Sequence, residues 1–166
     1  IADPELAPAG HEQARYLAEY LATEAIDALY SSPQQRAVQT AEPIALSKGL
    51  EITIVDDVAE RDRNSSEYVP IEELKADDDP RWQAMLRGEW NMDEGSPADF
   101  RDRVVTAVES LITAHQGHRI VVCCHGGVIN AYLAHVLGLP VTYGFFYPGY
   151  TSIHRVMAAA TGLRSI

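Results

Sequence analysis

Hydrophobic residues in this chain recur at two kinds of spacing. In some stretches they stand three or four positions apart, as Ala14, Leu17, Ala18 and Leu21 do, which predicts an amphipathic helix from Pro8 to about Thr23. The same spacing predicts helices over residues 34–48, 97–115 and 128–137, and two short ones near 71–75 and 81–87.

Short continuous apolar runs separate these helices. They predict strands at residues 26–31, 51–55, 119–124 and 152–158. Strands that alternate with helices favour right-handed crossovers and a mostly parallel sheet. The sequence therefore predicts an α/β fold, a three-layer α/β/α sandwich, whose ligands would bind at the carboxyl ends of the strands.

The 166 residues suit a single domain over 1–166, with an irregular insertion at about 59–97 that is rich in Asp, Glu and Ser. Long insertions of this kind are often functional, and we expect this one to lie over an edge of the sheet, near the active site. Three acids, Asp77, Asp78 and Asp79, precede Pro80 within it. We expect them to cap the next helix rather than to bind a metal, because no histidine accompanies them at ligand spacing.

The formal net charge of −11 argues against a nonspecific nucleic-acid or anionic-membrane binder, since both need a basic surface. The cysteines Cys123 and Cys124 are adjacent and lie in an apolar run, so we expect reduced core thiols in a cytoplasmic protein. If the ligand is an anion, its pocket has to be locally positive against this overall charge.

Two predicted strands run directly into helices through residues that can do chemistry. His125 follows the apolar run 119–124 and is followed by Gly126 and Gly127, which let the backbone approach a ligand at a helix N-terminus. Arg36 follows Ser31-Ser32-Pro33, in the first turn of the helix that we expect a serine to cap. Its planar guanidinium suits bidentate contact with phosphate or carboxylate.

A third candidate, Glu60, follows the strand at 51–55, where apolar cover would raise its pKa and make it a proton donor. Each of these residues alone is weak evidence for a site. An arginine on a helix is usually a surface residue, and a histidine at a strand end can be a simple turn residue.

Together the motifs are more specific. SSPQQRAVQTA at 31–41 closely resembles the SSP-x-x-RA-x-x-TA signature of the histidine phosphatase superfamily, the phosphoglycerate mutase-like proteins. CHGGVI at 124–129 resembles that family's second histidine motif, and LAPAGHEQA at 6–14 is similar to its helix start. The resemblance covers nearly the whole chain in the right order, and implies a phosphoglycerate mutase-like fold.

The resemblance implies a role for each candidate. Arg36 would hold the transferring phosphoryl group, with His125 and Gly126 at its oxygens, and Glu60 would protonate the leaving alkoxide. It also implies a small phosphorylated substrate and no cofactor or metal, and it is compatible with a homodimer.

The family's nucleophile is a histidine in an RHG motif at the end of its first strand, and no RHG occurs in these 166 residues. His11 falls at a variable position of a helix start, so it does not take this role. Arg36, His125 and Glu60 cannot by themselves supply the roughly 20 kcal/mol that phosphate-monoester hydrolysis requires, so either the RHG strand lies upstream of Ile1 or the protein is a phosphate-binding pseudoenzyme. We expect the former, because the family's RHG strand is central to its sheet and a protein without it would leave strand edges and apolar faces open.

The resemblance thus favours a phosphatase that works through a phosphohistidine. A phosphoglycerate mutase shares every step except the last, but the mutases usually continue HYG after the Glu-Arg pair, where this chain has Asp62-Arg63-Asn64. Arg61 and Arg63 are candidates for contact with a second anionic group. A catalytically inactive phosphate-binding module is the alternative from another class.

Overall fold

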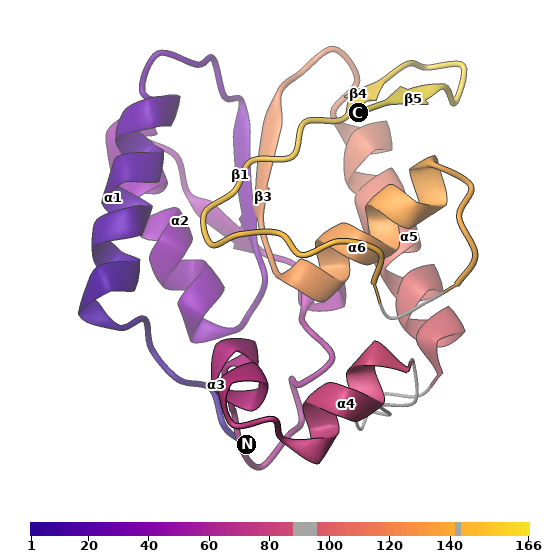
Figure 1. The fold of residues 1–166 in the computed structure, drawn as a ribbon. Coiled ribbons are helices and arrows are strands. Elements are labelled where there is room, and N and C mark those ends of the chain that lie inside the picture. The colour runs from indigo at the N-terminus through magenta and orange to yellow at the C-terminus, as the bar shows by residue number, and fades with distance from the viewer. Residues whose placement is uncertain (88–95, 142–143) are drawn as a thin grey trace.

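Three parallel strands form the centre of the fold in the computed structural model, which describes residues 1–87, 96–141 and 144–166 (Figure 1). β1 (Ala28–Ser31) lies between β2 (Ile52–Ile54) and β3 (Ile120–Cys123). Leu29 is opposite Ile52 on one side and Val121 on the other. All three strands run in the same direction, so their carboxyl ends meet at one edge of the sheet.

Helices cover both faces of this sheet. α1 (Pro8–Leu21) and α2 (Gln35–Lys48) lie on one side, and α5 (Pro97–Ala114) and α6 (Gly126–Val136) lie on the other (Figure 1). Each side has its own apolar core, centred on Leu29 and Ile44 in the first layer and on Phe100 and Val104 in the second. The predicted three-layer α/β/α sandwich with a parallel central sheet is confirmed.

The insertion folds into short pieces beside the sheet. η1 (Asp56–Val58), α3 (Ile71–Ala76) and α4 (Pro80–Leu86) follow β2, and α3 and α4 lie together at the lower end of Figure 1. The carboxylate of Asp79 accepts the Arg81 N–H at 2.8 Å, which confirms the predicted cap of α4. Residues 88–95 of the predicted insertion lie outside the described residues.

Two local predictions are wrong. Only β4 (Met157–Ala158) of the strand predicted at 152–158 forms, and it pairs with β5 (Arg164–Ser165) in a separate antiparallel pair. Residues 152–156 have no ladder partner within the described part of the chain, and a strand needs one. The serine cap of α2 is also wrong, because the carboxylate of Asp3 accepts the first free N–H, that of Gln35, at 2.9 Å.

One edge of β3 is unpaired among the described residues. A cleft of about 2620 Å³ separates this edge from residues 152–158 and continues to the carboxyl ends of the strands. Along β3 the cleft is lined by Ile120, Val121 and Val122, so its wall there is apolar. An apolar strand with an open edge is a template for pairing with another strand.

Candidate active site

His125 stands where β3 ends and α6 begins. It has extended backbone angles as the N-cap residue of α6, and its side chain turns toward the end of β1, where its Nε2 lies 2.7 Å from Ser32 Oγ. His125 is only 8% exposed. Burial, and then the positive charge of Arg36, lower the pKa of His125 to about 3. The imidazole is therefore neutral near pH 7, with one ring nitrogen able to donate a hydrogen bond.

Arg36 enters the same region from the first turn of α2. Its Nη2 donates to both carboxylate oxygens of Asp62, at 2.9 and 3.0 Å, and the guanidinium lies 4.7 Å from the ring centroid of Tyr68. The other terminal nitrogen, Nη1, is buried and has no hydrogen-bond partner among residues 1–87, 96–141 and 144–166. A buried donor without a partner costs about 1–3 kcal/mol, which a bound anion would relieve.

Glu60 follows η1 and faces the start of α6. Its Oε2 accepts the Gly127 N–H at 2.7 Å and its Oε1 accepts the Arg61 N–H at 2.9 Å. Burial raises the pKa of Glu60, with a smaller contribution from the charge of Asp62, while the two backbone N–H groups act in the opposite direction. A carboxyl group with a raised pKa can be protonated and serve as a general acid.

The two glycines after His125 differ in what surrounds them. A Cβ at Gly127 would lie 2.2 Å from Glu60 Oε1, so any other residue at this position would displace the Glu60 carboxyl group. A Cβ at Gly126 would meet only the Pro148 ring, at 3.5 Å, which is an ordinary van der Waals distance. The predicted phosphate-binding residue Gly126 lies at the first position of α6 and lines the cleft beside His125.

Arg36, Glu60 and His125 thus line one cleft at the carboxyl ends of the strands, although they come from three separate parts of the chain. A family model for the histidine phosphatase superfamily (branch 1) matches residues 1–163. The chain belongs to this superfamily.

Relatives within the superfamily include phosphatases and mutase-like proteins. Phosphoserine phosphatase 1 of Hydrogenobacter thermophilus is 30% identical over 162 residues, which cover 93% of this chain and 76% of that protein. Phosphoglycerate mutase-like protein 4 of Arabidopsis thaliana is 35% identical over 135 residues, or 78% of this chain and 59% of that protein. The chain therefore spans between about three fifths and three quarters of the length of these relatives.

The fold also matches solved structures of the superfamily. A mutant phosphoserine phosphatase from Entamoeba histolytica, in complex with phosphoserine, has a TM-score of 0.76 and 27% identity, covering 99% of this chain and 83% of that one. A mycobacterial glucosyl-3-phosphoglycerate phosphatase has a TM-score of 0.73 and 26% identity, covering 90% of this chain and 78% of that one.

Four further residues of this histidine phosphatase domain surround the predicted site. Ser32 contacts His125, Asp62 and Tyr68 contact Arg36, and Gln34 donates to Asp62 at 2.8 Å. Ser32 could have been found from its motif, but Gln34 occupies a variable position of that motif. Asp62 and Tyr68 lie in the irregular insertion, where no periodicity shows which way a side chain points.

The two arginines next to Glu60 are engaged within the fold. The Arg61 guanidinium lies 3.9 Å from the ring centroid of Phe100, and Arg61 is 7% exposed. Arg63 donates from Nη1 to the carbonyl oxygen of Asp56 at 3.0 Å. The suggestion that they contact a second anionic group stays a prediction.

The remaining histidines are not among the candidate site residues. His11 is exposed on α1, and His115 is hydrogen-bonded to Tyr30 through its Nε2 at 2.6 Å. No group of three or more His, Cys, Asp or Glu residues in the described ranges is arranged to hold a metal ion. Within the same ranges, no helix is long and apolar enough to cross a membrane. Cys123 and Cys124 are free thiols, and burial raises the pKa of each to about 12.

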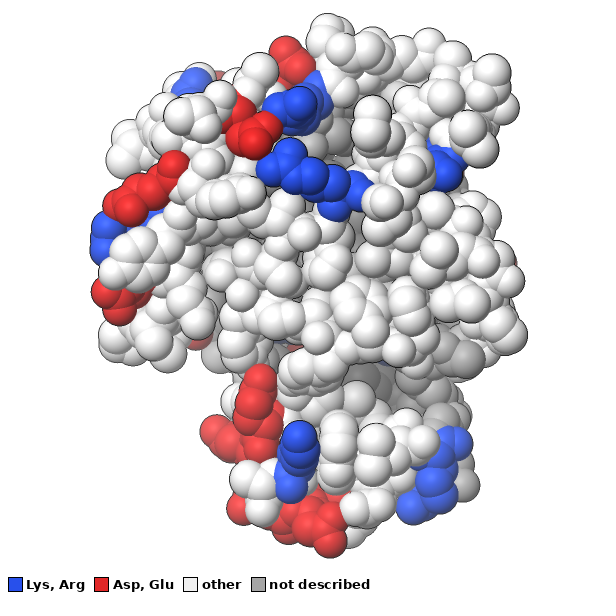
Figure 2. Space-filling model, turned by 45° about the horizontal axis from the view of Figure 1, so that its top comes forward, with Lys and Arg blue, Asp and Glu red and all other residues white. Residues whose placement is uncertain are grey.

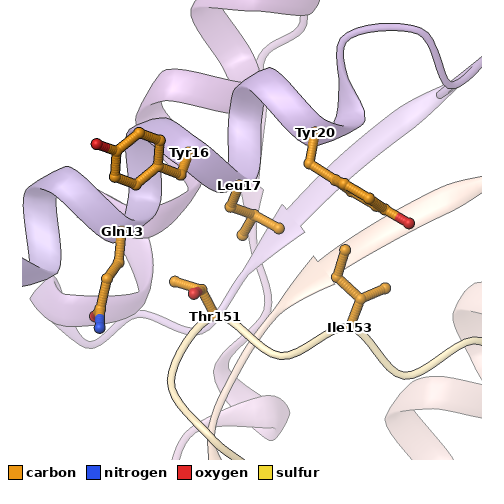
Figure 3. A pocket seen from close by; sticks show the side chains of 6 residues that line it. All are labelled: Gln13, Tyr16, Leu17, Tyr20, Thr151 and Ile153. Atoms are coloured by element: carbon orange, nitrogen blue, oxygen red, sulfur yellow. The ribbon is translucent and has the colours of Figure 1, made fainter.

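Charged side chains are unevenly distributed over the face drawn in Figure 2. Figure 2 shows charged side chains toward two ends of one face and a largely uncharged middle. A shallow hollow of about 470 Å³ lies between α1 and residues 151–153, where Leu17 and Tyr20 face Thr151 and Ile153 (Figure 3). Its lining contains no charged side chain, so it lacks the cation that a phosphate requires.

Proposed function

We propose that this protein is a phosphatase that hydrolyses phosphate monoesters through a phosphohistidine intermediate. The observation that carries the proposal is the buried Nη1 of Arg36, which has no partner in the described chain and lies in the same cleft as a neutral His125 and a protonatable Glu60. These are a cationic anchor, a neutral hydrogen-bond donor and a general acid, which phosphoryl transfer uses.

The roles follow from the chemistry of the three groups. Arg36 Nη1 binds a phosphoryl oxygen, and the neutral imidazole of His125 donates to another, so both stabilise the charge of the transition state. Glu60, protonated at its carboxyl group, gives its proton to the leaving alkoxide as the P–O bond breaks. In the second half-reaction the Glu60 carboxylate accepts a proton from the water that attacks the phosphohistidine.

The nucleophile in this proposal is a histidine outside residues 1–166, on a strand that pairs with the open edge of β3. The support is the apolar cleft between β3 and residues 152–158, which ends beside His125 and Arg36. A strand in this cleft would deliver a residue at its end to the carboxyl ends of β1 and β3, where the other groups lie.

Turnover of p-nitrophenyl phosphate by the full-length protein tests the proposal. We expect His125→Ala to lower kcat by two orders of magnitude or more, and Arg36→Ala to weaken inhibition by vanadate. Ser110→Ala, at an exposed position of α5 whose hydroxyl donates to the carbonyl oxygen of Thr106 in the same helix, serves as the control for handling and expression. Near-normal kcat in the His125 variant, or unchanged vanadate inhibition in the Arg36 variant, would remove the residue from its proposed role.

A panel of phosphorylated metabolites separates the phosphatase from its alternatives. Relatives carry both phosphatase and mutase names, so phosphoserine and 3-phosphoglycerate, the latter with and without its bisphosphate, belong in the panel. Release of inorganic phosphate supports the phosphatase. Phosphoryl exchange between positions of phosphoglycerate without release supports the mutase, and binding without either reaction supports the inactive module.

A further inference from the structure

Asp62 places a negatively charged side chain in a pocket that is proposed to bind phosphate, which is also negatively charged. Asp62 is 7% exposed, and its carboxylate accepts from Nη2 of Arg36, the residue proposed to hold the phosphoryl group. A buried carboxylate beside a dianionic substrate costs binding energy through like-charge repulsion. Another effect of Asp62 therefore has to offset this repulsion.

Asp62 leaves only one end of the Arg36 guanidinium available to bind a ligand. Nη2 is held by two hydrogen bonds to Asp62, while Nη1 is buried with no partner in the described chain. The Tyr68 ring, 4.7 Å from the guanidinium carbon, covers one face of the same group. Arg36 is 15% exposed at its side chain, so its plane and its direction are both fixed before any ligand binds.

Asp62 is itself anchored from the other side. Gln34 donates from Nε2 to Asp62 Oδ1 at 2.8 Å, and the Oε1 of the same amide accepts the Glu60 N–H at 2.7 Å. One buried amide thus links the partner of Arg36 to the backbone of Glu60. The distance between the phosphate anchor and the proposed general acid is set through this chain of hydrogen bonds.

We propose that Asp62 is a positioning residue that holds Nη2 of Arg36 and reserves Nη1 for the phosphoryl group, at a cost in phosphate affinity. The inference rests on the proposed function in that it takes Arg36 as the phosphate anchor. It does not depend on turnover, because the orientation of Arg36 governs phosphate binding with or without hydrolysis.

Two substitutions at this position separate charge from positioning. Asp62→Asn removes the charge but keeps an oxygen that can accept from Arg36, whereas Asp62→Ala removes both. We expect Asp62→Asn to bind inorganic phosphate at least threefold more tightly than the wild type at pH 7.5. Asp62→Ala should bind at least threefold more weakly than Asp62→Asn and lose at least tenfold in kcat for p-nitrophenyl phosphate relative to it.

Asp79→Asn is the matched control. Asp79 also pairs with an arginine of the insertion, Arg81, at 2.9 Å, and an asparagine can still cap α4. This variant should leave phosphate affinity and kcat within twofold of the wild type. Thermal melting of all four proteins establishes that each is folded.

Calorimetric titration with inorganic phosphate gives the dissociation constant of each variant, and the kinetic assay gives its kcat. Together they test the positioning role of Asp62. Asn and Ala variants with the same dissociation constant and kcat would overturn the positioning role, and an Asn variant that binds no more tightly than the wild type would overturn the cost in affinity. A wild type that binds phosphate with the expected Asp62 dependence but releases none from esters would sink the proposed phosphatase and leave this inference standing. A wild type that binds no phosphate would overturn the inference.

Discussion

Replacing Gly127 by alanine tests the contact on which the geometry of Glu60 depends. The new methyl group would lie 2.2 Å from Glu60 Oε1 and 2.9 Å from its Cδ, so the carboxyl group has to move. Moving it breaks the hydrogen bond from Gly127 N to Oε2, now 2.7 Å long. Leaving the Gly127 N–H without this acceptor costs about 1–3 kcal/mol, against which alanine gains at most about 1 kcal/mol of helix propensity over glycine.

We therefore expect Gly127→Ala to lower the free energy of unfolding by about 1–2 kcal/mol, measured by urea denaturation. The displaced carboxyl group should also lower kcat at least tenfold with p-nitrophenyl phosphate. Gly126→Ala is the matched control for stability, since its methyl group would meet only Pro148 at 3.5 Å. A Gly127 variant as stable and as active as the wild type would refute the account of Glu60.

Two further predictions concern pH and metals. The pKa of His125 is lowered to about 3 in the fold, so the stability that its neutral form provides is complete above the unfolded pKa of 6.5 and is lost as the pH falls toward 3. Between pH 6.5 and 4.5 this loss in the free energy of unfolding amounts to about 2–3 kcal/mol. In urea denaturation over the same pH range, the free energy of unfolding of His125→Gln should fall by about 2–3 kcal/mol less than that of the wild type. Equal losses in the two proteins would contradict the burial of a neutral imidazole. Phosphatase activity should survive EDTA, and a loss that a divalent metal restores would contradict the absence of a cofactor.

Local pattern was sufficient to predict the three layers of this fold. The helical spacing of Ala14, Leu17 and Ala18 and the apolar run before His125 reflect burial against the sheet, and burial leaves a periodic trace in sequence. The strand predicted at 152–158 failed because pairing depends on a neighbour and not on composition, and residues 152–156 face the cleft instead of a described strand.

In the site, too, residues in local motifs could be predicted, whereas contacts between residues far apart in the sequence could not. Arg36 and His125 stand in motifs at strand-to-helix turns, so their positions could be predicted from sequence. The partners that fix them could not, because Asp62 is 26 residues from Arg36 and Ser32 is 93 residues from His125. Gln34 occupies a variable position of its motif, and its role becomes visible only when Asp62 and Glu60 are seen on either side of its amide.

Trapping a phosphorylated form of the protein would show whether this cleft transfers a phosphoryl group to a histidine. The full-length protein would be mixed with radiolabelled phosphoserine or p-nitrophenyl phosphate, quenched within one turnover, and divided between acid and alkali. The account predicts a labelled protein that keeps its phosphate in alkali and loses it in acid, as a phosphoramidate does, with less label in Arg36→Ala. Label that is lost in alkali, or turnover with no labelled protein at any time, would contradict it.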